Sequence, residues 1–217
     1  KLNIINSTNS IIIRGSGIDT EYFKNPAKHL IFPKDKVWKI LFPGRIIKEK
    51  GIDELLIACD SLWKKNLKFK LYIAGKLVKP KNKKRAQIII DKISSLPYLE
   101  EVSFKQNMKE IYKKIDIVVL PSWREGLSKA LLEAASMNLP IITTDVPGCR
   151  DIVLHGITGL LVKLKDPIAI ESAIELLIKN TELCKRFSIN AREYVVENFR
   201  DTLINEFTYK AYLKAIN

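Results

Sequence analysis

Two glutamates bracket a glycine-bearing turn that opens a predicted helix. The run Pro121-Ser-Trp-Arg-Glu-Gly-Leu-Ser-Lys-Ala-Leu-Leu-Glu133 directly follows a mostly apolar stretch at 115–120. A glycine turn that leads into a helix exposes backbone amides, which bind anions such as phosphate. Glu125 and Glu133 lie on either side of this turn, and their carboxylates accept hydrogen bonds from vicinal sugar hydroxyls. A phosphate held between two diol-binding carboxylates indicates a nucleotide-sugar site.

The elements that must position this turn alternate between strands and helices. Apolar runs and apolar residues at helical spacing predict strands at 38–42, 69–74, 101–104, 116–120, 140–144 and 159–162, and helices at 51–62, 85–94, 108–114, 129–137 and 167–178. From Thr181 onward the pattern is amphipathic and helical. We therefore predict an α/β fold, a Rossmann-like doubly wound parallel sheet flanked by helices, with a helical C-terminal tail. Ligands of such sheets bind beyond the carboxyl ends of the strands, where the Glu125 turn begins.

The composition predicts a globular, cytoplasmic protein. A chain of 217 residues with 47% hydrophobic side chains suffices for one sizeable domain or two small ones. Its apolar runs fall short of the ~20 residues of a membrane span, and the N-terminus lacks the pattern of a secretory signal. The three cysteines, Cys59, Cys149 and Cys184, are odd in number and far apart. We expect reduced thiols rather than a disulfide framework or a zinc site.

The net charge of +13 favours anionic partners. It comes from 37 Lys and Arg against 24 Asp and Glu, and cations are dense in the run 76–85. Nucleic acid, an acidic membrane surface, a phosphorylated substrate and a merely solvated lysine-rich surface all stay open on charge alone. Few aromatic residues interleave with the basic run, which weakens the case for single-stranded nucleic acid.

Several motifs, in order, resemble those of one enzyme family. The segment Arg14-Gly-Ser-Gly-Ile-Asp-Thr-Glu-Tyr-Phe23 resembles the stretch after that family's hinge, and Gly44-Arg-Ile-Ile-Lys-Glu-Lys-Gly51 resembles its Gly-Arg to Lys-Gly loop. The spacing of Glu125 and Glu133 and the glycine-bearing segments within 146–162 follow. The chain is similar to the C-terminal, donor-binding domain of a family 4 glycosyltransferase of GT-B fold. The local sequence at 121–134 is similar to that of bacterial group 1 enzymes of polysaccharide, lipopolysaccharide and lipid-linked oligosaccharide assembly.

The resemblance implies a domain organisation. Residues 1–25 would be a segment after the hinge, 26–180 the Rossmann-like nucleotide-sugar-binding domain, and 181–217 the C-terminal helices. The family's N-terminal acceptor domain is absent, and the chain begins with Lys1, so we expect an excised or truncated domain. Alone it would bind the donor and turn over nothing, because catalysis needs the acceptor and the closing of two domains around both substrates.

The resemblance also implies catalytic residues, namely Glu125, Arg45 and Lys50. Arg45 and Lys50 would neutralise the donor diphosphate in place of a divalent metal, so no metal and no other cofactor is expected. Glu125 would contact hydroxyls of the transferred sugar close to the reacting carbon. Glu133 would hold the ribose diol.

Further donor-binding residues surround these. Amides of the turn would face the distal phosphate, Ser128 could cap the helix, and a segment after another strand would pair with the base through its backbone. Trp123 would either flank the sugar or pack, and Lys129 would either contact phosphate or stay solvated. The implied donor-binding set is Gly44, Arg45, Lys50, Gln106, Asn107, Met108, Glu125, Gly126, Leu127, Ser128 and Glu133.

The implied activity is that of a retaining hexosyltransferase. It would move a sugar from a nucleoside diphosphate, expected to be UDP, to a glycan or lipid-linked acceptor, and would not bind nucleic acid. The positive charge fits peripheral contact with the anionic inner face of the plasma membrane. Three alternatives stay open: a nucleotide-sugar epimerase of the same fold, a non-catalytic nucleotide-sugar-binding domain, and a basic nucleic-acid-binding protein, whose binding would fall steeply with salt.

Overall fold

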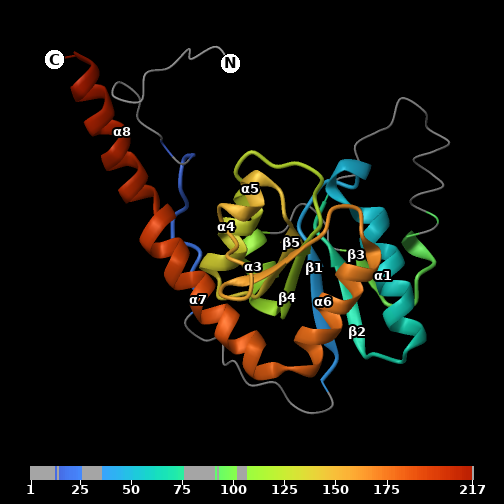
Figure 1. Ribbon diagram of the computed structural model, residues 1–217. Helices are drawn as coiled ribbons and strands as arrows, with labels where there is room; N and C mark the ends of the chain where they lie inside the picture. The colour runs from blue at the N-terminus through green and yellow to red at the C-terminus, as the bar shows by residue number, and fades with distance from the viewer. Residues whose placement is uncertain are drawn as a thin grey trace.

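Six parallel strands form one sheet in the order β3-β2-β1-β4-β5-β6 (Figure 1). The computed structural model describes residues 13, 15–25, 36–75, 91, 93–101 and 107–216. The strands are β1 (Trp38–Phe42), β2 (Phe69–Ile73), β3 (Leu99–Glu101), β4 (Ile117–Leu120), β5 (Ile141–Thr144) and β6 (Gly159–Val162). The strand order reverses between β1 and β4, and such a switch point is where doubly wound sheets bind ligands.

Helices cover both faces of the sheet. They are η2 (Lys48–Lys50), α1 (Ile52–Lys64), α3 (Met108–Lys114), α4 (Lys129–Ser136), α5 (Pro147–Arg150), α6 (Pro167–Lys179), α7 (Thr181–Phe199) and α8 (Asp201–Ile216). Helix α1 packs against α6, and α4 packs against α7. Because parallel crossovers are right-handed, α1 lies on one face and α3 and α4 lie on the other. Helix α8 extends away from the body (Figure 1).

The core explains why these runs become strands. All residues of β4 and β5 are buried, as expected for central strands that helices cover on both faces. Asp116, just before β4, is also buried, but it accepts hydrogen bonds from Lys36 Nζ at 2.6 Å and from the Lys39 amide at 2.9 Å. A buried carboxylate with two donors is tolerated in the core.

The predicted fold class is confirmed, and the bounds of several elements match. The strands at 38–42 and 159–162 and the helix at 108–114 lie where the sequence predicts them. The third strand begins at Leu99, before its predicted start, because Leu99 pairs with Leu71 of β2. Residues 102–106, the basic run 76–85 and most of the helix predicted at 85–94 lie outside the described residues.

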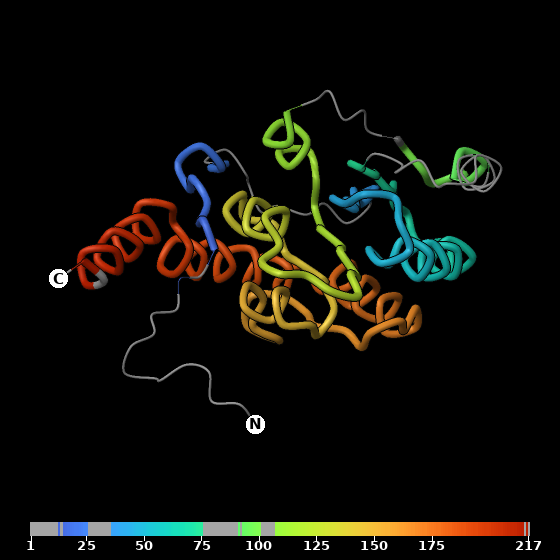
Figure 2. Tube along the Cα trace, turned by 90° about the horizontal axis from the view of Figure 1, so that it is seen from above, coloured from blue at the N-terminus to red at the C-terminus, as the bar shows by residue number. Residues whose placement is uncertain are grey.

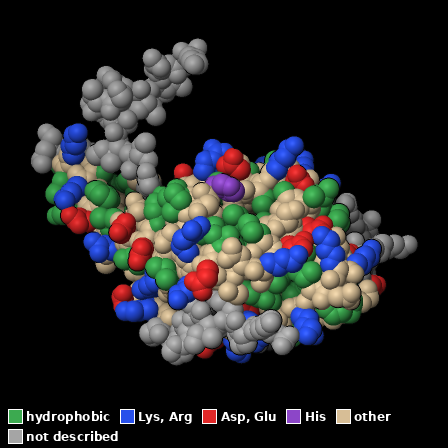
Figure 3. All heavy atoms as spheres, turned by 60° about the horizontal axis from the view of Figure 1, so that its bottom comes forward, with side chains coloured by type: hydrophobic (Ala, Val, Ile, Leu, Met, Phe, Trp, Pro, Cys, Tyr) green, Lys and Arg blue, Asp and Glu red, His purple; other side chains and the backbone are tan. Residues whose placement is uncertain are grey.

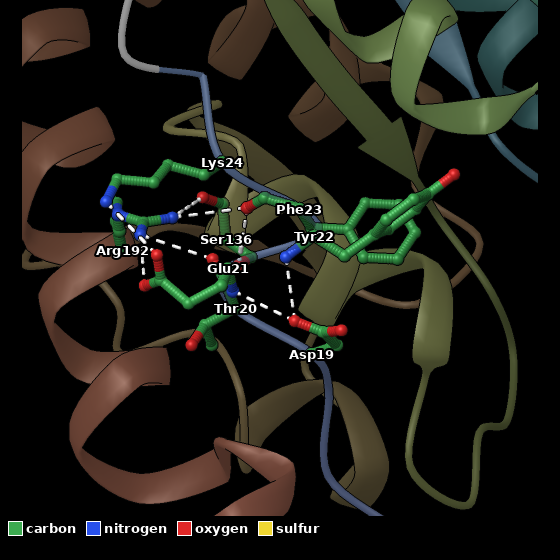
Figure 4. A network of polar contacts seen from close by, with 8 residues as sticks. All are labelled: Asp19, Thr20, Glu21, Tyr22, Phe23, Lys24, Ser136 and Arg192. Atoms are coloured by element: carbon green, nitrogen blue, oxygen red, sulfur yellow. Dashed lines mark hydrogen bonds and ion pairs between the residues drawn. The ribbon is translucent and has the colours of Figure 1, made fainter.

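A short segment before the sheet is fixed against α4 and α7 (Figure 4). This strap, Ile18–Lys24, begins with a bridge between Ile18 and Arg200. Arg192 on α7 donates to the carbonyl oxygens of Thr20, at 3.3 Å, and Phe23, at 3.2 Å. The boundaries at 25 and 180 stay a prediction.

The described surface is mixed in charge. On the face drawn in Figure 3, Lys and Arg side chains are interspersed with Asp and Glu. No described helix is both long enough and apolar enough to cross a membrane.

Candidate functional site

Two loops meet at the carboxyl edge of the sheet, which Figure 2 views from above. One loop joins β1 to α1, and the other joins β4 to α4. The Trp123 amide donates to Glu49 O at 2.8 Å, and Ser122 Oγ donates to the same oxygen at 3.1 Å. Gly51 has φ +73° and sits so close to Pro121 that a Cβ there would lie 2.0 Å from its carbonyl oxygen. The chain path therefore requires glycine where the loops touch.

An ion pair joins the two loops. Lys50 Nζ lies 2.5 Å from Glu125 Oε1, and the two side chains are only 19% and 11% exposed. Lys50 is the last residue of η2, which Gly51 ends in a left-handed conformation. The sequence predicts both residues for one site, and the structure brings them into contact.

Arg45 lies in the same loop, directly after Gly44, and its side chain is exposed. A Cβ on Gly75, just beyond β2, would lie 1.6 Å from Gly44 O. The chain just beyond β1 and the chain just beyond β2 are therefore in close contact beside Arg45. Its guanidinium makes no ion pair with the described residues, so it is available to an anion.

The turn before α4 carries unpaired amides. Gly126, Leu127, Ser128, Lys129 and Ala130 donate no backbone hydrogen bond within the described part of the chain. These are the donors that a helix start leaves open, and the helix dipole adds partial positive charge there. Ser128 is the N-cap residue of α4, as the sequence predicts, but its side chain makes no capping hydrogen bond.

The start of α5 supports this turn from below. A Cβ on Gly148 would lie 1.6 Å from Gly126 O and 2.6 Å from Glu125 O. The main chain of α5 therefore packs directly on the turn. By contrast, a Cβ on Gly126 itself would meet nothing within 4 Å. The turn presents its open side to solvent.

Glu133 lies on α4, about one turn beyond these amides. Its Oε2 accepts a hydrogen bond from Tyr112 Oη at 3.1 Å. Burial raises the pKa of the Glu133 carboxyl, while the Tyr112 hydrogen bond and the nearby Lys129 ammonium oppose that rise. The two predicted glutamates thus flank the turn from opposite ends.

The residues predicted to meet the base lie only partly within the described chain. Gln106 is outside it. Asn107 caps α3 by accepting from the Lys109 amide at 3.0 Å, and its Nδ2 donates to Tyr22 Oη at 2.8 Å. Met108 begins α3 and is partly buried. Because α3 follows β3, this helix start lies at the same edge of the sheet as the two loops.

Comparison with known proteins shows the family of this chain. Residues 22–194 match the family model described as glycosyl transferases group 1. The chain belongs to this family. Among curated relatives, it is 30% identical over 176 residues to the capsular polysaccharide biosynthesis glycosyltransferase CapM of Staphylococcus aureus, covering 80% of this chain and 46% of CapM. The chain spans about half the length of the curated relatives it matches.

Solved structures show the same fold as this group 1 glycosyltransferase chain. The C-terminal domain of a group 1 family protein, LpcC of Francisella tularensis, has a TM-score of 0.68 at 23% identity, covering 85% of this chain and 99% of that one. Anabaena HepE, solved in complex with UDP and glucose, has a TM-score of 0.77 at 15% identity, covering 90% of this chain and 55% of HepE. The match to LpcC confirms that the fold is that of a C-terminal domain.

Trp123 of this glycosyltransferase chain packs between charged groups. Its indole N–H donates to Glu54 Oε1 at 3.2 Å. Lys48 and Lys165 place their ammonium groups 5.4 Å and 4.1 Å from the ring centroid. The sequence leaves two roles open for Trp123, contact with the sugar or packing. These contacts favour packing, because two lysine ammonium groups already lie near the ring on which a sugar would stack.

Sequence reasoning missed Tyr112, because nothing in the sequence marks a core tyrosine as the partner of Glu133. His155 accepts a hydrogen bond from the Leu161 amide at 3.0 Å, which agrees with a structural role. The side chains of all three cysteines are buried. Among the described residues, no group of three or more His, Cys, Asp or Glu side chains could hold a metal ion.

Proposed function

We propose that this chain is the donor-binding half of a retaining, metal-independent hexosyltransferase that uses a UDP-linked sugar. The observation that carries the proposal is the contact between Lys50 and Glu125 beside the open amides before α4. It puts cations, amide donors and an acceptor carboxylate at one edge of the sheet. These are the groups that a diphosphate and a sugar require together.

Each residue has a distinct role in the proposed reaction. Lys50 and Arg45 stabilise the negative charge that develops on the leaving diphosphate, which a metal ion does in other transferases. The amides of 126–128 bind the distal phosphate. Glu125 accepts hydrogen bonds from the transferred sugar beside its reacting carbon, and Glu133 accepts hydrogen bonds from the ribose hydroxyls. Gly44 and the start of α3 line the rest of the donor site.

The comparisons support the choice of substrates. HepE was solved with UDP and glucose, and CapM is named for capsular polysaccharide biosynthesis. We therefore infer a UDP donor and a glycan or lipid-linked acceptor. The acceptor would bind an N-terminal half outside this chain, so the chain alone binds donor without transfer. We place the enzyme in the cytoplasm, with peripheral contact to anionic lipid.

Calorimetry and thermal unfolding with UDP, GDP and ADP in EDTA test the proposal. UDP should raise Tm by about 5–10 °C at 100 times its Kd, because a ligand that binds only the folded state stabilises it by mass action. Lys50→Ala should reduce this shift. No heat and no shift with any of the three at millimolar concentration would overturn the proposal. Product analysis of the full-length protein separates transfer from epimerisation.

A further inference from the structure

Tyr112 is a buried tyrosine whose hydroxyl contacts a site residue. Its side chain is 0% exposed, in the middle of α3. The hydroxyl oxygen lies 3.1 Å from Glu133 Oε2 and 3.2 Å from Ala130 O. A phenol has one proton and can donate it to one of these acceptors at a time. Both acceptors belong to α4, so this single hydroxyl fixes α3 to the part of α4 that carries Glu133.

Glu133 uses only one of its two carboxylate oxygens in this contact. Oε2 accepts from Tyr112, while Oε1 accepts no hydrogen bond from the described residues. A carboxylate that is held at one oxygen presents the other in a defined direction. Such an arrangement suits recognition of a diol, because both ligand hydroxyls need acceptors at fixed positions.

The ring of Tyr112 is itself held in place. Phe23 of the strap packs edge-on against it, with centroids 6.4 Å apart and an interplanar angle of 71°. The backbone of Phe23 is fixed in turn, because its carbonyl oxygen accepts from Ser136 Oγ at 2.8 Å and from Arg192 at 3.2 Å. The tyrosine therefore lies between a fixed strap and α4, and its hydroxyl has little freedom to leave Glu133.

We propose that Tyr112 is a positioning residue for the ribose hydroxyls of the donor, acting by orienting the Glu133 carboxylate through its phenol. This inference rests on the proposed function. It adds a residue from the middle of α3 to a site built from the turn before α4, the loop before α1 and the start of α3. The strap residue Phe23 completes the support by holding the tyrosine ring.

The phenol also keeps Glu133 in its acceptor form. Burial raises the pKa of this carboxyl, and the charged or polar groups that lower it are the Tyr112 hydroxyl from α3 and the Lys129 ammonium from α4. Loss of the hydroxyl should therefore raise the pKa of Glu133 further. A protonated Glu133 offers one acceptor fewer to a diol, so ribose binding should weaken at a higher pH than in the wild type.

Tyr112→Phe is the direct test, because it keeps the ring against Phe23 and removes only the hydroxyl. We expect calorimetry to show a loss of about 10-fold in UDP affinity and less than 2-fold in the affinity for 2′,3′-dideoxy-UDP, which lacks the ribose diol. The fall in UDP affinity at low pH should begin at a higher pH in the variant. In the Glu133→Ala background, which has no acceptor for the phenol, Tyr112→Phe should have no further effect on UDP binding.

Tyr98→Phe is the matched control. Tyr98 is also a buried tyrosine whose hydroxyl contacts a carboxylate, that of Asp60. Asp60 belongs to α1, which covers the other face of the sheet from α3. Tyr98→Phe should leave UDP affinity unchanged. Equal losses for UDP and dideoxy-UDP in Tyr112→Phe, or no loss at all while the wild type binds UDP, would overturn this inference and leave the proposed function standing. Absence of UDP binding by the wild type would overturn both.

Discussion

Lys50 Nζ and Glu125 Oε1 lie 2.5 Å apart, and this contact joins the loop before α1 to the turn before α4. In the proposed reaction the cation serves the diphosphate and the carboxylate serves the sugar. An ammonium has three N–H donors, so Lys50 can keep Glu125 while it binds a phosphate oxygen. The pair therefore holds both groups in position before the donor arrives, and less ordering is needed on binding.

Substitutions in this pair should separate the two roles. Lys50→Ala removes a charge-assisted contact to phosphate and should lower UDP affinity by about 10- to 100-fold. Glu125→Gln should retain UDP affinity within about 3-fold, because UDP lacks the sugar that this carboxylate contacts. In the full-length enzyme the same change should abolish transfer. Calorimetry with UDP and single-turnover assays measure the two effects.

Lys65→Ala is a suitable control for Lys50→Ala. Lys65 lies just after α1 and pairs with Glu171 and Glu175 of α6. Its side chain is about half exposed. Its loss should leave UDP affinity unchanged. The assignment of the diphosphate to Lys50 would fail if both lysine variants bound UDP like the wild type.

The fold was predictable because the sheet is central and parallel. Both central strands are buried on both faces: β4 is a short continuous apolar run, and β5 is a short run of β-branched residues. The helices between the strands show helical periodicity. Helix α5 was not predicted, because a four-residue turn beginning at Pro147 has no measurable periodicity. The start of β3 was missed because it is set by pairing with β2.

The site residues that belong to sequence motifs were predictable. The contacts that depend on tertiary packing were not. Lys50 and Glu125 follow strand ends that the fold brings to one edge, so their convergence follows from topology. The contact between Glu133 and Tyr112 does not follow from topology, because in the sequence Tyr112 looks like an ordinary core residue of an amphipathic helix. The failed cap at Ser128 has a similar cause: its residue type favours capping, but side-chain direction depends on the local backbone.

Glu133→Gln should raise stability while it weakens nucleotide binding. Burial raises the pKa of Glu133 in the folded state, so the stabilisation that protonation gives is complete below the unfolded pKa and is lost as pH rises through the folded pKa. At pH 7.5 the neutral amide avoids this loss, so we expect Tm to rise above that of the wild type. The gain should shrink as the pH is lowered toward 4. Thermal unfolding at several pH values measures it, and a gain that grows toward low pH would contradict the burial of this charge.

Gly148→Ala should destabilise the turn before α4. Its Cβ would lie 1.6 Å from Gly126 O, so the main chain of α5 or of the turn must move. Overpacking against backbone costs about 2–3 kcal/mol, which corresponds to a fall of about 5–10 °C in Tm. Thermal unfolding measures the loss, and UDP affinity should fall with it because the turn is displaced.

Gly126→Ala is the matched control for that change, because a Cβ there meets nothing within 4 Å. Its Tm should stay within about 1 °C of the wild type. UDP affinity should still fall several-fold, since the new methyl group occupies the open side of the turn where phosphate would bind. Equal Tm values for Gly148→Ala and Gly126→Ala would contradict the close packing of α5 on the turn.

Arg192→Ala should release the strap from the body. The guanidinium donates to the carbonyl oxygens of Thr20, Phe23 and Ser136, and three donors in a planar fork suit this arrangement (Figure 4). Its loss leaves partly buried carbonyls without that donor, which costs about 2–4 kcal/mol. We expect Tm to fall by about 5–10 °C and hydrogen exchange to accelerate in the peptide that spans 18–24.

The controls for Arg192→Ala separate geometry from charge. Lys24→Ala removes a cation from the same strap, but its exposed pair with Glu21 should be worth little, so Tm and exchange should stay as in the wild type. Arg192→Lys keeps the charge and loses the fork, and it should restore only part of the protection. Unchanged exchange at 18–24 in Arg192→Ala would show that the Ile18 bridge to Arg200 holds the strap without it. In that case Phe23 would keep its place against Tyr112, and UDP affinity should also be unaffected.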